Sequence, residues 1–432
     1  MIADFARSDH RAVQAQLDRL PKVSAAGDIL TLDRIQALCA RLGNPQERLP
    51  PVFHVAGTNG KGSTIAWLRA AIEAAGGSVH AYTSPHLVRF NERIRIAGRL
   101  INDDLLAGLL EHVIDAGQGL GVSFFEVATV AAFMAFARTP ADAALIEVGL
   151  GGRLDATNVV NPTVTGIAAL GIDHAHILGD TIEKIAFEKA GIAKPGVPLV
   201  INISSKSAPG AVIAARAIEV GAPLITQFHV DQDHGPKFYH DHSGQVAVPA
   251  AAIGRQLGNW TLATAMLRHQ SAVTLYDSAK AADRFDWPAR FQQLRGPLVK
   301  GMTWPVMLDG AHNAEGAALL ANRSYDWLRG SRGHVLMAGI LANRDPEAIL
   351  GPFAGIVERF IALPIPGHDH FDPAALAALA DRLFGRSDSI AAATIEDGFA
   401  TLRDLACDTD TIVMGSLYLA GEILRLSGQI PD

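Results

Sequence analysis

The chain is poor in cysteine, and this scarcity excludes several classes of protein. Only Cys39 and Cys407 occur among its 432 residues, far apart and in no spacing typical of metal ligands. Small secreted domains held by disulfides carry many more cysteines, and structural zinc sites carry them in close pairs. The cysteines therefore indicate neither a disulfide framework nor a zinc site, and they favour a reducing environment.

The chain also lacks a strong charge of either sign and a long hydrophobic run. Charged residues make up 19% of the sequence, and its net charge is −7, with lysines and arginines scattered along the chain. The most apolar helical stretch, residues 127–137, is too short to cross a bilayer and is typical of a buried helix. Residues 1–13 do not contain the apolar core of a secretory signal. We therefore expect a cytoplasmic protein with no nucleic-acid or membrane partner.

The order of the apolar segments predicts an α/β fold. After a helical segment at residues 9–42, with a turn near residues 21–27, apolar strands alternate with helical runs. Continuous apolar strands separated by helices predict a parallel sheet that is covered on both faces. The expected strands are residues 51–56, 78–83, 143–148, 163–169 and 198–203, and then residues 306–308, 334–338, 359–363 and 411–414.

The length of the chain and a restart of the α/β alternation after residues 288–297 predict two domains. A chain of 432 residues exceeds one ordinary domain, and a boundary is expected near residues 288–297. We expect a doubly wound, mostly parallel sheet in residues 1–290, which includes the N-terminal helical segment. A smaller Rossmann-like α/β domain is expected in residues 291–432.

One polar segment, residues 227–248, interrupts the α/β pattern. It contains His229, His234, His240 and His242, whose spacing fits no common metal-binding pattern. We expect irregular strands or a solvated surface loop here.

A glycine-rich segment, residues 54–64 (HVAGTNGKGST), follows the first expected strand and precedes a helix. Gly57 and Gly60 permit a tight turn whose backbone N–H groups can bind phosphate oxygens. Lys61 can reach the β- and γ-phosphates of a nucleotide, and Ser63 can offer its hydroxyl to Mg²⁺. The segment therefore predicts a phosphate-binding loop.

The match to the general P-loop pattern is imperfect. Only Thr58 and Asn59 separate Gly57 from the next glycine, where the pattern has four residues, and Gly62 separates the lysine from Ser63. A glycine-rich turn with a chance lysine is the alternative interpretation.

Three further polar residues follow expected strands or lie on the next helix. Glu147 lies near the end of the strand at residues 143–148, where an acidic residue of a P-loop fold reaches Mg²⁺, although a surface glutamate would fit the same pattern. His174 is better explained as a structural histidine on chemistry alone, because Mg²⁺ prefers oxygen ligands. Lys189 lies on a helix whose charges also suit a salt-bridged surface.

These segments belong to an ordered series of motifs along nearly the whole chain. The series is LGNPQ (42–46), HVAGTNGKGS (54–63), YTSPHLVRFNERI (82–94), FFEVAT (124–129), EVGLGGRLDATN (147–158), GIDHAHILGDTIEKIAFEKAGI (171–192), WPARF (287–291), LDGAHN (308–313) and GSLYLAGE (415–422). Together they resemble the folylpolyglutamate synthase/dihydrofolate synthase family of the Mur ligase superfamily.

The resemblance implies a Mur-ligase-like central domain and an ATP-dependent ligase. Such an enzyme adds L-glutamate to dihydropteroate, to tetrahydrofolate polyglutamates or to both, through an acyl phosphate, and releases ADP and phosphate. A bifunctional enzyme is the expectation. Its implied cofactors are two Mg²⁺ ions, with room for a monovalent cation, and ATP is a co-substrate. The partners are then small molecules, and we expect a monomer.

The resemblance also implies roles for individual residues. The implied ATP-binding residues are Gly57, Thr58, Asn59, Gly60, Lys61, Gly62, Ser63, Asn259, Arg290 and Asp309. The implied magnesium ligands are Ser63, Glu147, His174 and Lys189, the last as the carbamate that its amine forms with CO₂. The implied catalytic residues are Lys61, Lys189 and His312. The folate or pterin site would include Ser84, Pro85, His86, Phe124 and Asp155.

The sequence departs from the family in the segments around Asn259 and Arg290. Arg255 stands before Gln256 where the family has histidine, residues 260–262 replace a run of alanines, and Ala289 replaces the glycine of WPGRF. Two alternatives to the folate ligase stay open. One is a ligase acting on a UDP-linked muramyl acceptor, although only about 50 residues precede the phosphate loop, too few for a uridine-sugar domain. The other is a P-loop ATPase or nucleotide switch without ligase activity.

Overall fold

The computed structural model describes residues 8–20, 30–231, 236–327, 334–405 and 410–432. Cys407, His234 and the turn expected near residues 21–27 lie outside these ranges. The chain divides into two compact units, residues 1–286 with residue 432, and residues 287–431. Arg290 therefore lies in the second unit, whereas the sequence placed it at the end of the first domain.

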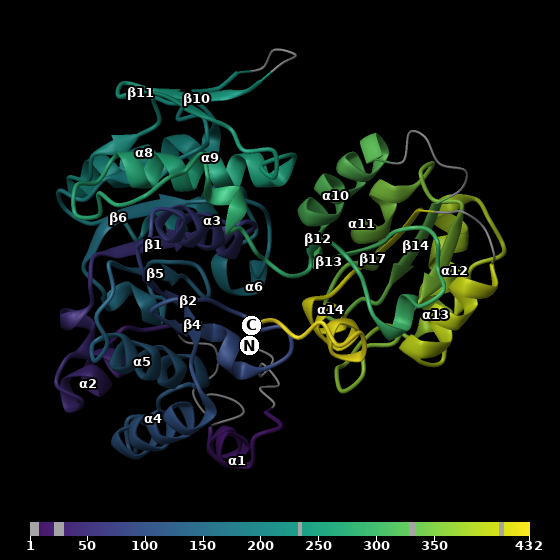
Figure 1. Cartoon of the computed structure of the whole chain (residues 1–432), viewed down its shortest axis with the longest axis horizontal. Coiled ribbons are helices and arrows are strands. Elements are labelled where there is room, and N and C mark those ends of the chain that lie inside the picture. Colours follow the sequence, from purple (N-terminus) through teal and green to yellow (C-terminus); the bar gives the residue numbers. More distant parts are fainter. Residues whose placement is uncertain (1–7, 21–29, 232–235, 328–333, 406–409) are drawn as a thin grey trace. The chain divides into compact units, whose positions relative to one another are not determined.

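The first unit contains an eight-stranded sheet in the order β4-β3-β2-β5-β1-β6-β7-β8 (Figure 1). The neighbouring strands β2, β5, β1, β6, β7 and β8 pair in parallel, whereas β3 is antiparallel to β2 and the edge strand β4 is antiparallel to β3. This topology confirms the mostly parallel sheet predicted from the sequence. The strands are β1 (Val52–Ala56), β2 (Val79–Tyr82), β3 (Ile94–Ile96), β4 (Arg99–Leu100), β5 (Ala143–Glu147), β6 (Pro162–Ile167), β7 (Leu199–Ile201) and β8 (Leu224–Ile225).

Helices connect these strands and cover both faces of the sheet. The helices are α1 (Arg11–Arg19), α2 (Asp33–Arg41), α3 (Lys61–Ala74), α4 (Asp103–Ala116), α5 (Phe124–Phe136), α6 (Ala175–Leu178), α7 (Ile182–Ala190), α8 (Ala208–Val220) and α9 (Arg255–Arg268). Short 3₁₀ turns are η1 (Pro45–Arg48), η2 (Phe90–Arg93), η3 (Ala156–Val159) and η4 (Ala281–Asp283).

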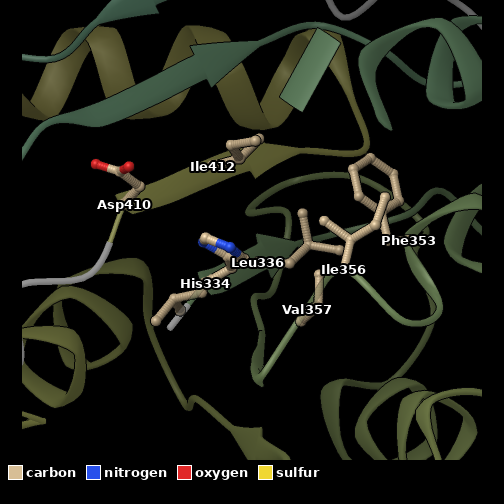
Figure 2. A pocket seen from close by; sticks show the side chains of 8 residues that line it. His334, Leu336, Phe353, Ile356, Val357, Asp410 and Ile412 are labelled. Atoms are coloured by element: carbon tan, nitrogen blue, oxygen red, sulfur yellow. The ribbon is translucent and has the colours of Figure 1, made fainter. Parts of the chain in front are cut away.

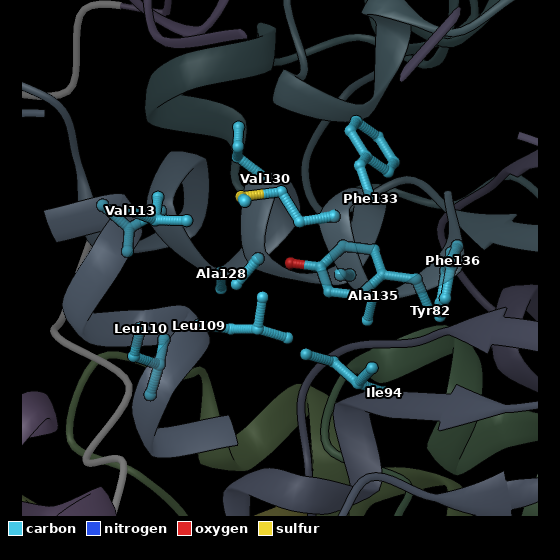
Figure 3. Packing of buried hydrophobic residues seen from close by; sticks show 14 of the residues in the cluster. Tyr82, Ile94, Leu109, Leu110, Val113, Ala128, Val130, Phe133, Ala135 and Phe136 are labelled. Atoms are coloured by element: carbon cyan, nitrogen blue, oxygen red, sulfur yellow. The ribbon is translucent and has the colours of Figure 1, made fainter. Parts of the chain in front are cut away.

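The central strands send alternate side chains into two separate cores. Tyr82 and Ile146 pack in one core with residues of α4 and α5, and Figure 3 shows Tyr82 beside the α5 residues of this core. Phe53 and Leu145 pack in the other core, with residues of α3 and α9. Because side chains on both faces are buried, these strands read as continuous apolar runs in the sequence.

Local capping signals fix where two helices of the first unit begin. At the start of α5, the Ser123 hydroxyl accepts a hydrogen bond from the Glu126 N–H at 3.3 Å, and the Glu126 carboxylate accepts one from the Ser123 N–H at 2.6 Å. Such a reciprocal pair satisfies two N–H groups that the helix cannot pair. At the start of α7, the Thr181 hydroxyl accepts from Lys184 N–H, and this start places Lys189 in the last turn of the helix.

The polar segment after residue 227 forms a small antiparallel sheet, the first of the two alternatives expected from the sequence. Its strands are β9 (His229–Val230), β10 (Phe238–Asp241) and β11 (Gly244–Ala247), in the order β11-β10-β9. Val230 and Tyr239 are buried in the core that α9 covers, and the Tyr239 ring lies edge-on to Trp260 at 6.2 Å. The inward-facing apolar residues explain why a polar sequence still forms a sheet here.

The second unit contains a six-stranded sheet in the order β12-β13-β17-β14-β15-β16. β12 runs antiparallel to β13, and the other neighbouring strands are parallel. The strands are β12 (Arg290–Gln293), β13 (Val306–Asp309), β14 (His334–Ala338), β15 (Arg359–Ala362), β16 (Ile390–Ala391) and β17 (Asp410–Met414). The helices are α10 (Ala314–Trp327), α11 (Pro346–Leu350), α12 (Pro373–Phe384), α13 (Ile395–Asp404) and α14 (Leu417–Leu426), with 3₁₀ turns η5 (Pro297–Val299) and η6 (Gly351–Phe353).

The four strands predicted for the C-terminal part are confirmed as β13, β14, β15 and β17. In the described parts of the chain, no helix has both the length and the apolar character needed to cross a membrane.

Candidate active site

The predicted phosphate loop connects the end of β1 to the start of α3. Gly57 has φ +151° and Gly60 has φ +88°, so the loop uses backbone conformations that other residues rarely adopt. The Thr58 N–H donates to the Ala169 carbonyl at 2.8 Å, and its hydroxyl donates to the Gly171 carbonyl at 2.8 Å. These bonds tie the loop to the segment that follows β6. α3 begins at Lys61, so the first N–H groups of a helix point toward the loop, as phosphate binding requires.

A Cβ atom at either glycine of the loop would also force a neighbouring group to move. A Cβ atom at Gly57 would lie 2.9 Å from the Cβ of Ala168, and one at Gly60 would lie 2.3 Å from Oδ1 of Asn259. Asn259, predicted to serve the adenine side of ATP, is thus held against the phosphate loop. Its neighbour Gln256 accepts a hydrogen bond from the indole of Trp67 on α3 at 3.0 Å, which fixes α9 beside the loop.

Two lysines lie at the loop and share one hydrogen-bond acceptor. Lys189 donates to the Gly57 carbonyl at 2.8 Å, and Lys61 donates to the same oxygen at 3.1 Å and to the Thr58 carbonyl at 3.3 Å. Burial, reinforced by the positive charge of Lys61, lowers the pKa of Lys189 to about 7, although Asp173 and Asp155 act in the opposite direction. A large part of Lys189 is therefore a neutral amine at neutral pH, and only the neutral amine can react with CO₂.

Two oxygen donors predicted to bind magnesium lie at the end of β5 and in the first turn of α3, the helix that follows β1 and the glycine loop. Glu147 ends β5 and is paired in register with Val55 of β1, and it is 4% exposed. Its carboxylate accepts a hydrogen bond from the Ser84 N–H at 3.2 Å. Ser63 lies in the first turn of α3 and is 3% exposed. A hydroxyl and a carboxylate are oxygen donors that Mg²⁺ prefers, so this donor set fits the ion.

His174 lies on the segment after β6, at the N-terminal end of α6. Its φ of +52° is left-handed, and its N–H donates to the Asp173 carboxylate at 2.8 Å. Its side chain is 40% exposed, so the ring is accessible to a ligand. Sequence reasoning missed Asp173, whose charge acts on Lys189. Its position next to His174 in the GIDH motif was the available signal.

Two of the residues predicted for the pterin, His86 and Phe124, contact a buried arginine that sequence reasoning also missed. Arg93 has no exposed surface, and its Nε donates to His86 Nδ1 at 2.8 Å. Its guanidinium lies 5.3 Å from the ring centroid of Phe124 and 5.5 Å from that of Phe90. Ser84 and Pro85 are joined by a cis peptide just before His86. The structure therefore brings the TSPHL segment and the start of α5 together.

Asp155 is buried and holds the loop between β5 and η3. Its carboxylate accepts hydrogen bonds from the N–H groups of Leu150 at 2.8 Å and Thr157 at 3.0 Å. Burial raises the pKa of Asp155, and these hydrogen bonds partly offset the rise. Thr157 also contacts Nε2 of His54 at 2.9 Å, and burial lowers the pKa of His54 to about 3, so this ring is neutral. The pterin role of Asp155 stays a prediction.

In the second unit, Arg290 and Asp309 lie on paired strands. They are register partners in β12 and β13, and Arg290 lies between two residues with left-handed backbones, Ala289 (φ +54°) and Phe291 (φ +58°). Asp309 is fully buried and accepts a hydrogen bond from the Ala311 N–H at 2.9 Å. Left-handed residues other than glycine are strained, and such strain is often kept where it positions a functional side chain.

Gly310 and His312 complete this group. A Cβ atom at Gly310 would lie 2.6 Å from Nη1 of Arg290, and the Arg290 guanidinium donates to the Ala289 carbonyl at 2.9 Å. Nδ1 of His312 lies 2.8 Å from the Gly310 carbonyl, so the backbone of the LDGAHN motif orients the imidazole.

One pocket of the second unit lies away from these residues (Figure 2). His334 and Asp410, which begin β14 and β17, line it together with Leu336, Phe353, Ile356 and Val357. The pocket is at the amino ends of the strands, whereas Asp309 is at the carboxyl end of β13. It contains none of the residues predicted for the site.

Comparisons with known proteins identify relatives that cover almost the whole chain. No protein-family model matches it. A dihydrofolate synthase/folylpolyglutamate synthase of Bacillus subtilis is 32% identical over 420 residues, which cover 91% of this chain and 94% of that protein. The structure of E. coli FolC in complex with DHPP and ADP has a TM-score of 0.83 at 27% identity and covers 95% of this chain and 96% of that one. A bifunctional folylpolyglutamate synthase/dihydrofolate synthase with Mn, AMPPNP and L-glutamate bound has a TM-score of 0.82 at 28% identity and covers 97% and 99% of the two chains.

Proposed function

Because the chain belongs to the folylpolyglutamate synthase/dihydrofolate synthase family, it is an ATP-dependent ligase, and we propose that it adds L-glutamate to folate-type acceptors. Dihydropteroate and reduced folates are the proposed acceptors, so one chain would perform both reactions. The observation that supports this proposal best is made at the glycine loop. There, Lys61 and the buried Lys189 both donate hydrogen bonds to the carbonyl oxygen of Gly57.

Ligation requires activation because a free carboxylate does not react with an amine at neutral pH. A carboxylate oxygen of the acceptor attacks the γ-phosphorus of ATP, and ADP leaves with the electrons of the broken P–O bond. The amine of glutamate then attacks the carbonyl carbon of the acyl phosphate, loses a proton and expels inorganic phosphate. Negative charge spreads over the phosphoryl oxygens in the first step.

Residues of the first unit are proposed to offset this charge. The ammonium of Lys61 and the loop N–H groups would bind the phosphates, which stabilises charge as it develops. Ser63 and Glu147 would hold Mg²⁺, with His174 and a carbamylated Lys189 as further ligands. When bound, the ion supplies a Lewis acid to the phosphoryl oxygens.

The lowered pKa of Lys189 supports its carbamylation, because a neutral amine is the form that reacts with CO₂. The amine nitrogen attacks the carbon of CO₂ and loses its proton, so a cation becomes an anion. An anion at this position would reduce the repulsion from Lys61 and could help to hold a second divalent ion.

Three residues of the second unit are proposed to act in the ATP-dependent reaction. Arg290 would bind phosphate, Asp309 the ribose, and His312 would act in catalysis. Their shared position at the end of β13 and beside β12 supports this assignment. In the first unit, Asn259 would contact the adenine side, and Ser84, Pro85, His86, Phe124 and Asp155 would form the acceptor site.

An assay of ADP release and product mass tests the proposal. Purified protein is incubated with Mg²⁺ and ATP, with and without L-glutamate, and with dihydropteroate or tetrahydrofolate as acceptor. We expect ADP release only when glutamate and an acceptor are both present, and a mass increase of one glutamate. Glutamate-independent hydrolysis would instead support a nucleotide switch, and failure to bind Mg·ATP would overturn the assignment. A monomeric state and a cytoplasmic location stay predictions.

A further inference from the structure

The small sheet β9–β11 brings together three side chains that can bind a metal. In the register of β9 and β10, His229 lies opposite His240. Their rings are nearly parallel, with centroids 4.9 Å apart and an angle of 12° between the planes. Nε2 of His240 lies 2.9 Å from Oδ1 of Asp231, which follows β9. One donor atom from each of the three residues lies within 4.8 Å of the others.

Three donor atoms this close can converge on one transition-metal ion once the two stacked rings turn. Zinc binds histidine nitrogen and carboxylate oxygen at about 2.0–2.2 Å, so two ligand atoms of a tetrahedral site are roughly 3.3–3.6 Å apart. The Asp231–His240 contact is shorter than this, so these two atoms must separate to admit the ion, and the exposed His229 ring must turn out of its stack on His240. His229 and His240 come from the paired strands β9 and β10, so the sheet register places them opposite each other.

We propose that His229, Asp231 and His240 form a binding site for a divalent transition-metal ion, best Zn²⁺, separate from the magnesium site of the ligase. Two imidazoles and one carboxylate suit Zn²⁺, Co²⁺, Ni²⁺ or Cu²⁺, whereas Mg²⁺ prefers oxygen ligands alone. The ion replaces the His240–Asp231 hydrogen bond, and water completes the coordination.

A second group nearby is less suited to a cation. Asp241, His242 and His269 also have donor atoms within 4.8 Å of one another. However, the Arg268 guanidinium donates to both carboxylate oxygens of Asp241, at 2.6 and 2.7 Å. The guanidinium of Arg268 is always positively charged and already pairs with both oxygens of this carboxylate. Its charge repels a metal ion that approaches Asp241.

Metal binding at the first group would stabilise the side of the unit that supports α9. The ion links β9 to β10, and the buried residues Val230 and Tyr239 on these strands pack in the core that contains Trp260 of α9. Asn259, next to Trp260, contacts the phosphate loop at Gly60. An ion that binds only the folded protein raises the free energy of unfolding. The increase grows with the ratio of the free ion concentration to the dissociation constant.

The test uses the full chain without a polyhistidine tag, freed of metals by chelation. Isothermal titration with Zn²⁺ is performed with saturating Mg²⁺ and AMP-PNP present, so that the ligase site is occupied. We expect the wild-type protein to bind Zn²⁺ and to melt at a higher temperature with it. His229→Gln and His240→Gln should each weaken the Zn²⁺ affinity at least about tenfold, since each removes one of three ligands.

Two matched variants serve as controls. His112→Gln removes an exposed histidine of α4, and His242→Gln removes one from the second group. Both should keep the wild-type affinity. Equal Zn²⁺ affinity in His229→Gln, His240→Gln and wild type would overturn the proposal. A loss of Zn²⁺ affinity in His242→Gln instead would also overturn it.

Asp231→Asn tests the carboxylate with little change of side-chain shape and should also weaken Zn²⁺ binding. Because the readouts are affinity and melting temperature, the result is independent of whether the ligase proposal holds.

Discussion

The ammonium groups of Lys61 and Lys189 donate to the same carbonyl oxygen, that of Gly57, at 3.1 and 2.8 Å. Lys189 is 4% exposed, and its burial, reinforced by the positive charge of Lys61, lowers the pKa of Lys189 to about 7. The pair therefore combines a charged lysine, suited to phosphate, with a lysine of pKa about 7, suited to carbamylation.

The lowered pKa of Lys189 predicts a pH-dependent stability. Between about pH 7 and the usual lysine range, the unfolded chain is protonated at this residue and the folded protein is not, so the free energy of unfolding rises with pH. Below about pH 7, Lys189 is protonated in both the folded and the unfolded protein. The folded protein is then destabilised by the whole free energy needed to bury this charge. Lys189→Met should therefore stabilise the protein more at pH 6 than at pH 9.

Urea denaturation at the two pH values, in CO₂-depleted buffer, measures this difference. Its size should be on the order of 1–4 kcal/mol, given about 1.4 kcal/mol for each unit of pKa shift. An equal effect of Lys189→Met at both pH values would show that Lys189 has an ordinary pKa.

Carbamylation predicts that the ligase depends on CO₂. Lys189→Ala should lose most activity, and wild-type activity should fall in CO₂-depleted buffer and return with bicarbonate. The loss of activity in CO₂-depleted buffer should be largest on the acid side of the pH–rate profile. Below about pH 7 only a small fraction of Lys189 is the neutral amine that reacts with CO₂. Full activity of Lys189→Ala without added CO₂ would contradict this role.

Lys61→Ala should leave the fold intact and reduce ligation strongly. Removing one group that stabilises transition-state charge typically costs about 10²–10³-fold in kcat. Lys206→Ala, an exposed lysine after β7, is the matched control and should keep wild-type activity. Glutamate-dependent ADP release at the wild-type rate in Lys61→Ala would refute phosphate binding by this lysine, and circular dichroism reports whether the variant is folded.

Gly60→Ala should raise the KM for ATP by displacing Asn259. The new Cβ would lie 2.3 Å from Oδ1 of Asn259, and the backbone φ of +88° adds strain. Gly196→Ala is the control, because its φ of +70° brings similar strain with nothing within 4 Å of the new Cβ. That variant should lose only about 1–2 kcal/mol of stability.

A double variant separates the clash from the strain. Gly60→Ala with Asn259→Gly removes the clash, so it should recover stability relative to Gly60→Ala alone while ATP affinity stays low. No recovery of stability would mean that the contact between Gly60 and Asn259 is not the cause of the loss.

Gly310→Ala should affect catalysis by moving Arg290. Its Cβ would lie 2.6 Å from Nη1 of Arg290 and 2.4 Å from Cδ2 of Leu417. A displacement of about 1 Å in a catalytic group can cost roughly 10²-fold in rate. Steady-state kinetics should therefore show a loss similar to that of Arg290→Ala. Gly355→Ala, whose new Cβ has no neighbour within 4 Å, should keep the activity. If Gly310→Ala is as active as Gly355→Ala, Arg290 is not positioned through Gly310.

Local sequence patterns were sufficient to predict central strands of both sheets. The apolar runs at residues 143–148 and 334–338 correspond to β5 and β14, because a strand buried on both faces must be apolar along its length. For the polar segment around Tyr239 the sequence left irregular strands and a surface loop open, and the structure has short strands. These strands depend on packing against Trp260 of α9, which is distant in the sequence.

The sequence by itself determined the alternation of strands and helices, the glycine turn before α3 and the order of the motifs, because these depend on residues close together in the chain. Only the tertiary structure decided that Lys189 has a pKa near 7, that Asn259 lies against Gly60, and that His229 and His240 face each other with Asp231 in reach. The physical reason is that burial, charge interactions and ligand geometry depend on which side chains become neighbours in space, and in these cases folding brings together residues that local patterns do not connect.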